Sequence, residues 1–307
     1  MNSPDTTGGD AGELEGLASL LEASGKYRVL RRLRLRSPAR PSTNVAIRRG
    51  VFVDTETTGL DPDNDEIVEL AMLGFDYSVD GGYVSPAASF DRLRDPGRPI
   101  SNEVSVLTGI TDEMVFGKSI DPAEVASFLE GAALLIAHNA SFDRLFCERS
   151  FPVFADKPWA CSLREIDWKT EGFDSARLSH LANACGLFFD GHRALTDCEA
   201  ALELLSRPLP RSGRTGLSVI LESARRSRWR IRAVASPFHR RDVLKQRGYR
   251  WEAADRGRPG AWCTEVEESA FEEECRFLRN DIYRRSDTTL DTRLLTAFER
   301  YSSRAAS

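Results

Sequence analysis

Three short motifs constrain most strongly what this chain can fold into. The apolar run 50–53 (GVFV) leads into residues 54–60 (DTETTGL), and the apolar run 134–137 (LLIA) leads into residues 138–143 (HNASFD). The third motif, residues 192–197 (HRALTD), opens a segment with helical spacing. Short apolar runs that alternate with helical segments predict an α/β fold. In such a fold, each motif lies next to the end of a strand or the start of a helix.

The first motif pairs two carboxylates at the end of a predicted strand. Asp54 and Glu56 are two residues apart, so their side chains point to the same face of that strand. Two carboxylates in this position repel each other unless a cation lies between them, and oxygen ligands of this kind suit Mg²⁺ or Mn²⁺. By itself, however, such a pair is more typical of a strand that turns polar as it meets water.

The second and third motifs each add an acid near a helix start. Asp143 falls in the first turn of a predicted helix, which Ser141 can cap and where the helix dipole favours an anion. His192 and Asp197 are five residues apart and do not share a helix face, so we expect a loop histidine in front of a helix carboxylate. Each residue alone also has a plain structural interpretation. The ordered set of acids with one histidine makes that interpretation weak.

As a set, these motifs resemble the DEDDh exonuclease family and, within it, the proofreading epsilon subunits of bacterial DNA polymerase III. The similarity covers about residues 50–206 and includes residues 99–101 (PIS) and 109–114 (GITDEM). It implies a ribonuclease H-like fold, which is a mixed sheet with helices on both faces. Many members carry a histidine just before Gly-Ile-Thr-Asp. This chain has Thr108 there, which we expect to affect packing or substrate contact rather than activity.

The resemblance implies a metal-dependent 3′→5′ exonuclease that binds two ions, Mg²⁺ or Mn²⁺, and releases nucleoside 5′-monophosphates. Asp54, Glu56 and Asp197 would bind the first ion. Asp54 would also bridge to the second ion, which Asp143 would support directly or through water. His192 would act as the general base on the attacking water.

The resemblance also implies contacts with the end of the substrate. Thr57 is expected near the terminal 3′-OH, and Leu60 is expected as an apolar wedge against the last base. His138, Asn139 and Phe142 would shape the groove, although for Phe142 core packing is the favoured interpretation. The catalytic set is shared with exoribonucleases similar to RNase T or oligoribonuclease, so DNA and RNA stay alternatives. A non-catalytic nucleic-acid-binding protein is disfavoured, because all five catalytic positions carry competent residues.

Composition divides the chain into four predicted regions. They are an N-terminal arm (1–45), an exonuclease domain (46–208), a Pro/Gly/Ser-rich linker (209–222) and a small α+β module (223–307). The arm is predicted to be disordered at first and then helical over 13–24. Its later stretch, residues 30–36 (LRRLRLR), is either a solvated segment or a basic arm that touches phosphates. In the exonuclease domain, strands are predicted at 50–53, 66–73, 88–93 and 134–137, and helices at 122–129, 141–149, 175–185 and 193–205.

The C-terminal module is locally basic. Ten Lys and Arg residues but one acid lie between Arg225 and Arg250, and aromatic residues are interleaved with them. Arginines with aromatics are typical of surfaces that bind single-stranded nucleic acid. For the tryptophans we favour a different interpretation, in which Trp229, Trp251 and Trp262 pack together as a small core. The arginines remain candidates for phosphate contact, unless the acidic segment 265–274 neutralises them.

Bulk properties limit the partners and the compartment. The net charge of −5 argues against a protein that coats nucleic acid over its whole surface. No apolar run reaches 18 residues, and residues 1–15 do not resemble a signal peptide, so we expect no membrane. Six cysteines without a C-x-x-C pair suit reduced thiols in the cytoplasm. The expected partners are single-stranded 3′ ends of nucleic acid and, as an option, a DNA polymerase.

Overall fold

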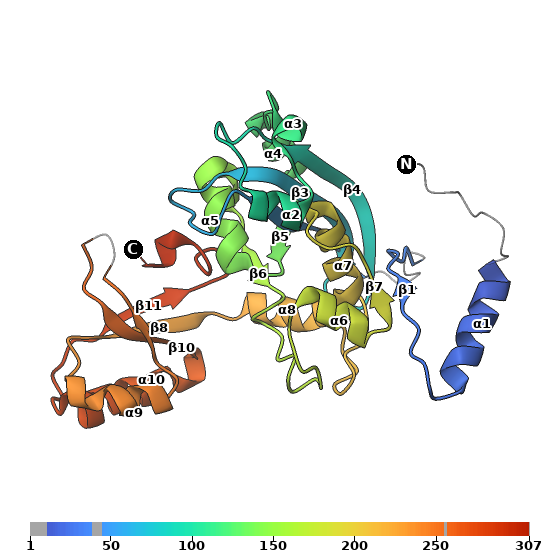
Figure 1. Cartoon of the computed structure of the whole chain (residues 1–307). Coiled ribbons are helices and arrows are strands. Elements are labelled where there is room, and N and C mark those ends of the chain that lie inside the picture. The colour runs from blue at the N-terminus through green and yellow to red at the C-terminus, as the bar shows by residue number, and fades with distance from the viewer. Residues whose placement is uncertain (1–10, 39–44, 255–256, 307) are drawn as a thin grey trace.

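The computed structural model describes residues 11–38, 45–254 and 257–306, and within these ranges the largest sheet has five strands in the order β4-β3-β2-β5-β6 (Figure 1). β3 pairs antiparallel with β2 and β4, whereas β5 runs parallel to β2 and β6 runs parallel to β5. The strands are β2 (Ile47–Thr57), β3 (Ile67–Ser78), β4 (Val84–Leu93), β5 (Ala132–Ala137) and β6 (Trp159–Cys161).

Helices cover both faces of this sheet (Figure 1). α4 and α5 pack on one face, and α6, α7 and α8 pack on the other. This arrangement confirms the predicted ribonuclease H-like fold. None of the helices in the described ranges is long and apolar enough to cross a membrane. The helices are α4 (Pro122–Phe128), α5 (Ala140–Ser150), α6 (Leu178–Ala184), α7 (Ala194–Leu205) and α8 (Gly216–Arg225).

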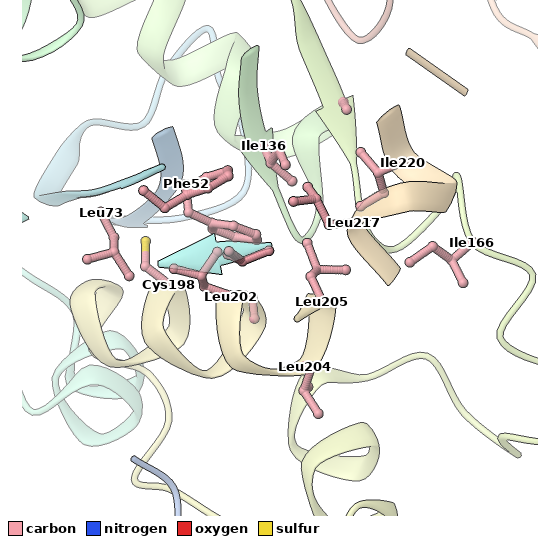
Figure 2. Packing of buried hydrophobic residues seen from close by; sticks show 14 of the residues in the cluster. Phe52, Leu73, Ile136, Ile166, Cys198, Leu202, Leu204, Leu205, Leu217 and Ile220 are labelled. Atoms are coloured by element: carbon pink, nitrogen blue, oxygen red, sulfur yellow. The ribbon is translucent and has the colours of Figure 1, made fainter. Parts of the chain in front are cut away.

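Alternation along β2 explains why both faces are covered. Val51 and Val53 are fully buried against the α5 side, and Phe52 is fully buried against the α7 side. Figure 2 shows Cys198 and Leu202 of α7 directed toward Phe52. Because β2 is apolar on both faces, it forms the centre of the domain. The buried centre of β2 therefore holds the carboxyl end of the strand in a fixed position.

Short helices that we did not predict lie between β4 and α4. α2 (Asn102–Thr108) begins after Ser101, whose side chain accepts the backbone N–H of Val104, and α3 (Asp112–Val115) follows. Thr108 is buried at the end of α2. Its hydroxyl donates to the Val104 carbonyl and accepts the Ile110 N–H, so this residue serves local packing.

The basic stretch of the N-terminal arm docks on the exonuclease domain. After α1 (Ala11–Ala23), strand β1 (Arg31–Arg32) pairs in parallel with β7 (Leu187–Phe188). Arg31 forms ion pairs with Glu15 and Glu22, and Arg36 Nε lies 2.7 Å from Oε1 of the buried Glu203. These arginines are therefore engaged by protein carboxylates. Disorder was predicted for residues 1–12. Positions 1–10 lie outside the described residues, whereas residues 11 and 12 form the start of α1, so the prediction was wrong for these two.

The segment predicted as a linker belongs to the main core instead. Leu217, Ile220 and Leu221 of α8 are buried in the same cluster as Phe52 and α7. Figure 2 shows Leu217 and Ile220 in this cluster. Thr215 caps this helix by accepting the Ser218 N–H at 3.1 Å. Pro, Gly and Ser are as common in tight turns as in linkers, and the helical spacing of the following apolar residues was the better signal.

The C-terminal module is a small sheet with helices on one face. Within the described residues its four antiparallel strands have the order β11-β8-β10-β9 (Figure 1). Their apolar side packs against α9, α10 and a π-helical turn, η3. The elements are β8 (Arg228–Val234), α9 (Arg241–Gln246), β9 (Arg250–Glu252), β10 (Ala261–Glu267), α10 (Glu268–Phe277), η3 (Leu278–Tyr283) and β11 (Asp291–Leu295).

The tryptophans of this module do not form the predicted cluster of three. Trp251 and Trp262 meet edge to face, with ring centroids 5.7 Å apart. Trp229 stacks on Phe271 instead, with centroids 4.1 Å apart. Trp262 and Trp229 lie on the same face of the sheet but near opposite ends of the β8–β10 pair, which separates them.

The chain returns to the exonuclease domain after β11. Arg144 of α5 is fully buried and donates to the backbone carbonyls of Ala297, Phe298 and Arg300, at 3.3, 2.6 and 2.6 Å. The backbone N–H of Trp159 also donates to the Ala297 carbonyl at 2.7 Å. The predicted division at 223–307 is therefore not a clean one, because the last described residues of that range complete the surroundings of α5.

Candidate active site

The carboxyl end of β2 and the start of α7 bring three acids together. Asp54 and Glu56 point to the α7 side of the sheet, and Asp197 lies in the first turn of α7. Asp54, Glu56 and Asp197 each offer a carboxylate oxygen, and these oxygens all lie within 4.8 Å of one another. The structure thus gathers three of the four acids that the sequence predicted as metal ligands.

The fourth acid, Asp143, lies on the other side of β2. It sits in the first turn of α5, is 3% exposed, and accepts hydrogen bonds from the Thr55 N–H and hydroxyl at 3.1 and 2.9 Å. Asn139, rather than Ser141, occupies the N-cap of α5, and the Ser141 hydroxyl donates to the Asn139 side-chain oxygen. Thr55 therefore fixes the Asp143 carboxylate beside the strand that carries the other two acids.

Burial and mutual repulsion make these acids hold their protons. Burial raises the pKa of Glu56 to about 8, and the nearby Asp197 charge adds to the effect. Burial likewise raises the pKa of Asp143 to about 7 and of Asp197 to about 6, and that of Asp54 lies well above its usual range. Clustered carboxylate oxygens with too little positive charge around them fit a hard divalent cation, which would restore the ionised state of each acid.

His192 occupies the loop in front of Asp197. Its backbone has a positive φ of 66°, which is uncommon for a residue other than glycine, and its N–H donates to Asp197 Oδ2 at 2.8 Å. The residue is exposed. The hydrogen bond ties the position of the histidine to the same carboxylate that belongs to the acidic cluster.

A buried ion pair that we did not predict supports this loop. Glu69 of β3 is fully buried, pairs with Arg193 at 2.6 Å, and also accepts the Ala194 N–H at 2.9 Å. Glu69 lies opposite Glu56 in the β2–β3 register. It therefore anchors the start of α7 to the sheet. The signal was an acid inside the apolar run 66–73, because a carboxylate in a buried strand requires a partner.

The residues predicted to contact the substrate differ in how accessible their side chains are. Leu60 is 84% exposed, whereas Thr57 is buried and its hydroxyl donates to the Gly59 carbonyl at 2.6 Å. Phe142 packs against Phe146 with ring centroids 4.8 Å apart, in agreement with the favoured packing interpretation. Asn139 is exposed at the start of α5. Leu60 and Asn139 are thus the predicted contacts with accessible side chains.

His138 is committed to the protein through both ring nitrogens. Nε2 lies 2.8 Å from the Ala176 carbonyl, so it carries the proton and Nδ1 accepts the Ser162 hydroxyl at 2.9 Å. Burial lowers the pKa of His138, which favours this neutral form. The ring joins the end of β5 to the end of β6 and to the loop before α6. It therefore holds these three segments together.

A family model described as Exonuclease matches residues 51–205. The chain belongs to this exonuclease family. The match confirms the family resemblance inferred from the sequence, and it contains all five positions predicted to be catalytic. It ends at the last residue of α7, before α8 and the C-terminal module.

Relatives of this exonuclease include much longer proteins named DNA polymerase III PolC-type. The one from Thermotoga maritima is 30% identical over 205 residues, covering 62% of this chain and 14% of the relative. The one from Latilactobacillus sakei is 43% identical over 162 residues, covering 50% of this chain and 11% of the relative. The exonuclease thus spans about one seventh or less of these relatives.

Among solved structures, the exonuclease is similar to Exonuclease X in complex with 5′ overhanging duplex DNA. The two share 27% sequence identity with a TM-score of 0.43, over 56% of this chain and 98% of the other.

Proposed function

We propose that this protein removes nucleotides from the 3′ end of DNA and releases nucleoside 5′-monophosphates. One observation carries the proposal: the clustered carboxylates Asp54, Glu56 and Asp197 lie beside an exposed histidine that is tied to one of them. Clustered carboxylates can bind the metal ions that assist phosphodiester hydrolysis, and the histidine supplies a proton acceptor. Membership of the exonuclease family supports the same reaction class.

The acids are proposed to hold two Mg²⁺ or Mn²⁺ ions. Bound there, the ions would neutralise the phosphate and make a coordinated water more acidic. Asp54, Glu56 and Asp197 form the near group of ligands, and Asp143 contributes from the opposite side of β2, where Thr55 holds its carboxylate. Asp54 belongs to the cluster on the α7 side and also interacts electrostatically with Asp143, so it is the proposed shared ligand.

His192 is the proposed acceptor of the proton from the attacking water. An imidazole exchanges protons near neutral pH, and an exposed loop position allows it to reach over a bound substrate. Its backbone hydrogen bond to Asp197 limits that reach to the neighbourhood of the acidic cluster. The exposed Leu60 is the proposed apolar contact for the terminal base.

DNA is the proposed substrate because the curated relatives carry the name of a DNA polymerase. The same relatives support a proposed association with a polymerase and a proposed location in the cytoplasm, where six free thiols stay reduced. RNA is the rival substrate, since the acidic cluster binds the phosphodiester common to both.

The test uses full-length protein with Mg²⁺ and matched single strands of DNA and RNA labelled at the 5′ end. We expect a ladder of progressively shorter labelled DNA strands and unlabelled nucleoside 5′-monophosphates. Immediate release of a labelled mononucleotide would show the opposite direction. Faster shortening of RNA would assign the rival substrate, and intact strands of both kinds would refute the nuclease proposal. An Asp54→Asn preparation controls for contaminating nucleases.

A further inference from the structure

A cleft of about 1300 Å³ separates the exonuclease domain from the C-terminal sheet. One wall contains the loop after β2, at Pro62, and one face of α5, formed by Ser141, Leu145 and Glu148 at helical spacing. Strands β8, β9 and β10 form the other wall. The same loop and the same helix start also carry the catalytic motif, because Glu56 precedes the loop and Asp143 lies in the first turn of α5. The cleft therefore borders two of the elements that carry the proposed active site, although the proposed catalytic residues are not among the residues that line it.

The sheet side of this cleft is basic because of alternation along β8. Arg228, Arg230 and Arg232 point into the cleft, while Trp229 and Ile231 point to the helices on the other face. The neighbouring strand β9 adds a further arginine to the same face. Among the described residues that line the cleft, eight are arginines and four are acids. The cleft thus carries a positive excess in a chain whose net charge is −5.

Part of this positive charge is not neutralised by the protein. Arg230 pairs with Glu252, and Arg232 lies 2.8 Å from Asp291. Other arginines of the cleft form no ion pair or side-chain hydrogen bond with any described residue; they are Arg164, Arg228, Arg250 and Arg258. The module core lies on the opposite, apolar face of the sheet, away from Arg228 and Arg250. Like charges gathered in a cleft favour a polyanion as the occupant.

We propose that this cleft binds the sugar–phosphate backbone of the nucleic-acid strand whose 3′ end lies in the catalytic site. Evenly spaced phosphates match arginines that are distributed along a cleft, and the excess of arginines over acids in the lining suits a charged backbone better than the apolar surface of a folded partner. The loop after β2 and the start of α5 border both the proposed site and the cleft, so a strand held at the site can continue into the cleft. The inference rests on the proposed exonuclease function and names its binding surface.

The test measures binding of a fluorescent single-stranded 20-mer, in DNA and RNA forms, by full-length protein in EDTA. For Arg228→Ala/Arg250→Ala, we expect the Kd at 0.1 M salt to rise on the order of 10-fold, since two phosphate contacts are lost. The slope of log Kd against log salt should fall by about 1.4, or about 0.7 per contact. The matched control is Arg276→Ala/Arg285→Ala, which removes the same charge from exposed positions of the same module outside the cleft. Both variants are first checked for wild-type thermal unfolding.

A second measurement separates the cleft from the catalytic site. With Mg²⁺, hydrolysis of a mononucleotide p-nitrophenyl ester should be equal in wild type and the cleft variant, whereas KM for the 20-mer should rise. Unchanged binding and KM in the cleft variant, or an equal loss in the control, would overturn the cleft proposal while leaving the nuclease proposal intact. Absence of ester and DNA hydrolysis in the wild type would instead refute the proposed function, and the binding data would still test the cleft.

Discussion

The carboxylate cluster and the arginine cleft both gather like charges, but they do so in different ways. The acids lie within 4.8 Å of one another and their pKa values are raised, so they require positive charge at a fixed point. The arginines are distributed over a cleft of about 1300 Å³, and some of them already form ion pairs with acids of the protein. A compact cluster suits chemistry, whereas a dispersed one suits affinity. Changes in the cluster should therefore act on kcat and changes in the cleft on KM.

The largest effect that this comparison predicts is for Asp197→Asn. The amide keeps the shape and can still accept the His192 N–H, but it removes one negative charge from the cluster. We expect kcat on single-stranded DNA to fall about 10³-fold, equivalent to about 4 kcal/mol, with little change in KM. Steady-state kinetics beside Arg250→Ala, which should keep its kcat, provide the contrast. A variant that retains a tenth of the wild-type kcat would remove Asp197 from the catalytic group.

The next effect concerns His192. His192→Ala should lower kcat by roughly 10²–10⁴-fold, because a positioned proton acceptor is lost while the acids remain. Added free imidazole should restore part of the activity, which a purely structural role would not permit. His180→Ala removes another exposed histidine, on α6, and serves as the control. Failure of imidazole to rescue would indicate that His192 acts through the loop conformation alone.

A smaller effect is expected for Glu69→Gln, which weakens the anchor of the α7 start but leaves the three clustered carboxylates in place. We expect unfolding free energy to fall by about 1–3 kcal/mol and kcat to fall by about 10-fold, with KM unchanged. Arg193→Ala should have a similar effect, and the double variant should lose little more, because the two residues act through one ion pair. Additive losses in kcat would show that they act separately.

The smallest predicted effect is on thermal stability. Unfolded carboxyl groups release protons near pH 4–4.5, whereas Glu56 in the fold does so near pH 8. The folded state thus binds more protons between these values, and the metal-free protein should lose stability as pH rises from about 5 to about 8. Saturating Mg²⁺ at pH 8 should raise Tm by on the order of 5 °C. Asp54→Asn/Glu56→Gln should flatten both dependences in differential scanning calorimetry; a Tm independent of pH and Mg²⁺ in the wild type would argue against a metal site.

The sequence predicted the clustered acids of the site better than it predicted the residues that hold the site in place. Spacing of two along a strand places Asp54 and Glu56 on one face, and the structure brings Asp197 to them as the family resemblance implied. The strand that contains Glu69 was predicted correctly. The ion pair of Glu69 with Arg193 was missed, because the prediction did not consider that a buried carboxylate needs a partner. For His138, the sequence shows the residue but not that Ser162 and Ala176 occupy both ring nitrogens.

For the fold, local patterns predicted the longer elements and failed where long-range contacts decide. The runs around β2, β3 and β5 are continuous and apolar, so their strands were clear. β1 and β7 have two residues each, too few for any periodicity. α8 was hidden by the Pro/Gly/Ser content before it. The pairing of the basic arm with Glu15, Glu22 and Glu203 depends on positions up to 167 residues apart, which no local pattern encodes.

The buried Arg144 has a consequence for the order in which this protein is assembled. Its guanidinium needs the carbonyls of Ala297, Phe298 and Arg300, which follow it by more than 150 residues. While those carbonyls are missing, the guanidinium keeps its ion pair with Glu148 of the same helix, but its other N–H groups must stay in water. During synthesis, a nascent chain whose exonuclease domain has emerged from the ribosome therefore still lacks the backbone acceptors of Arg144. The surroundings of Arg144 are completed only once the C-terminal sheet has folded and passed the chain back.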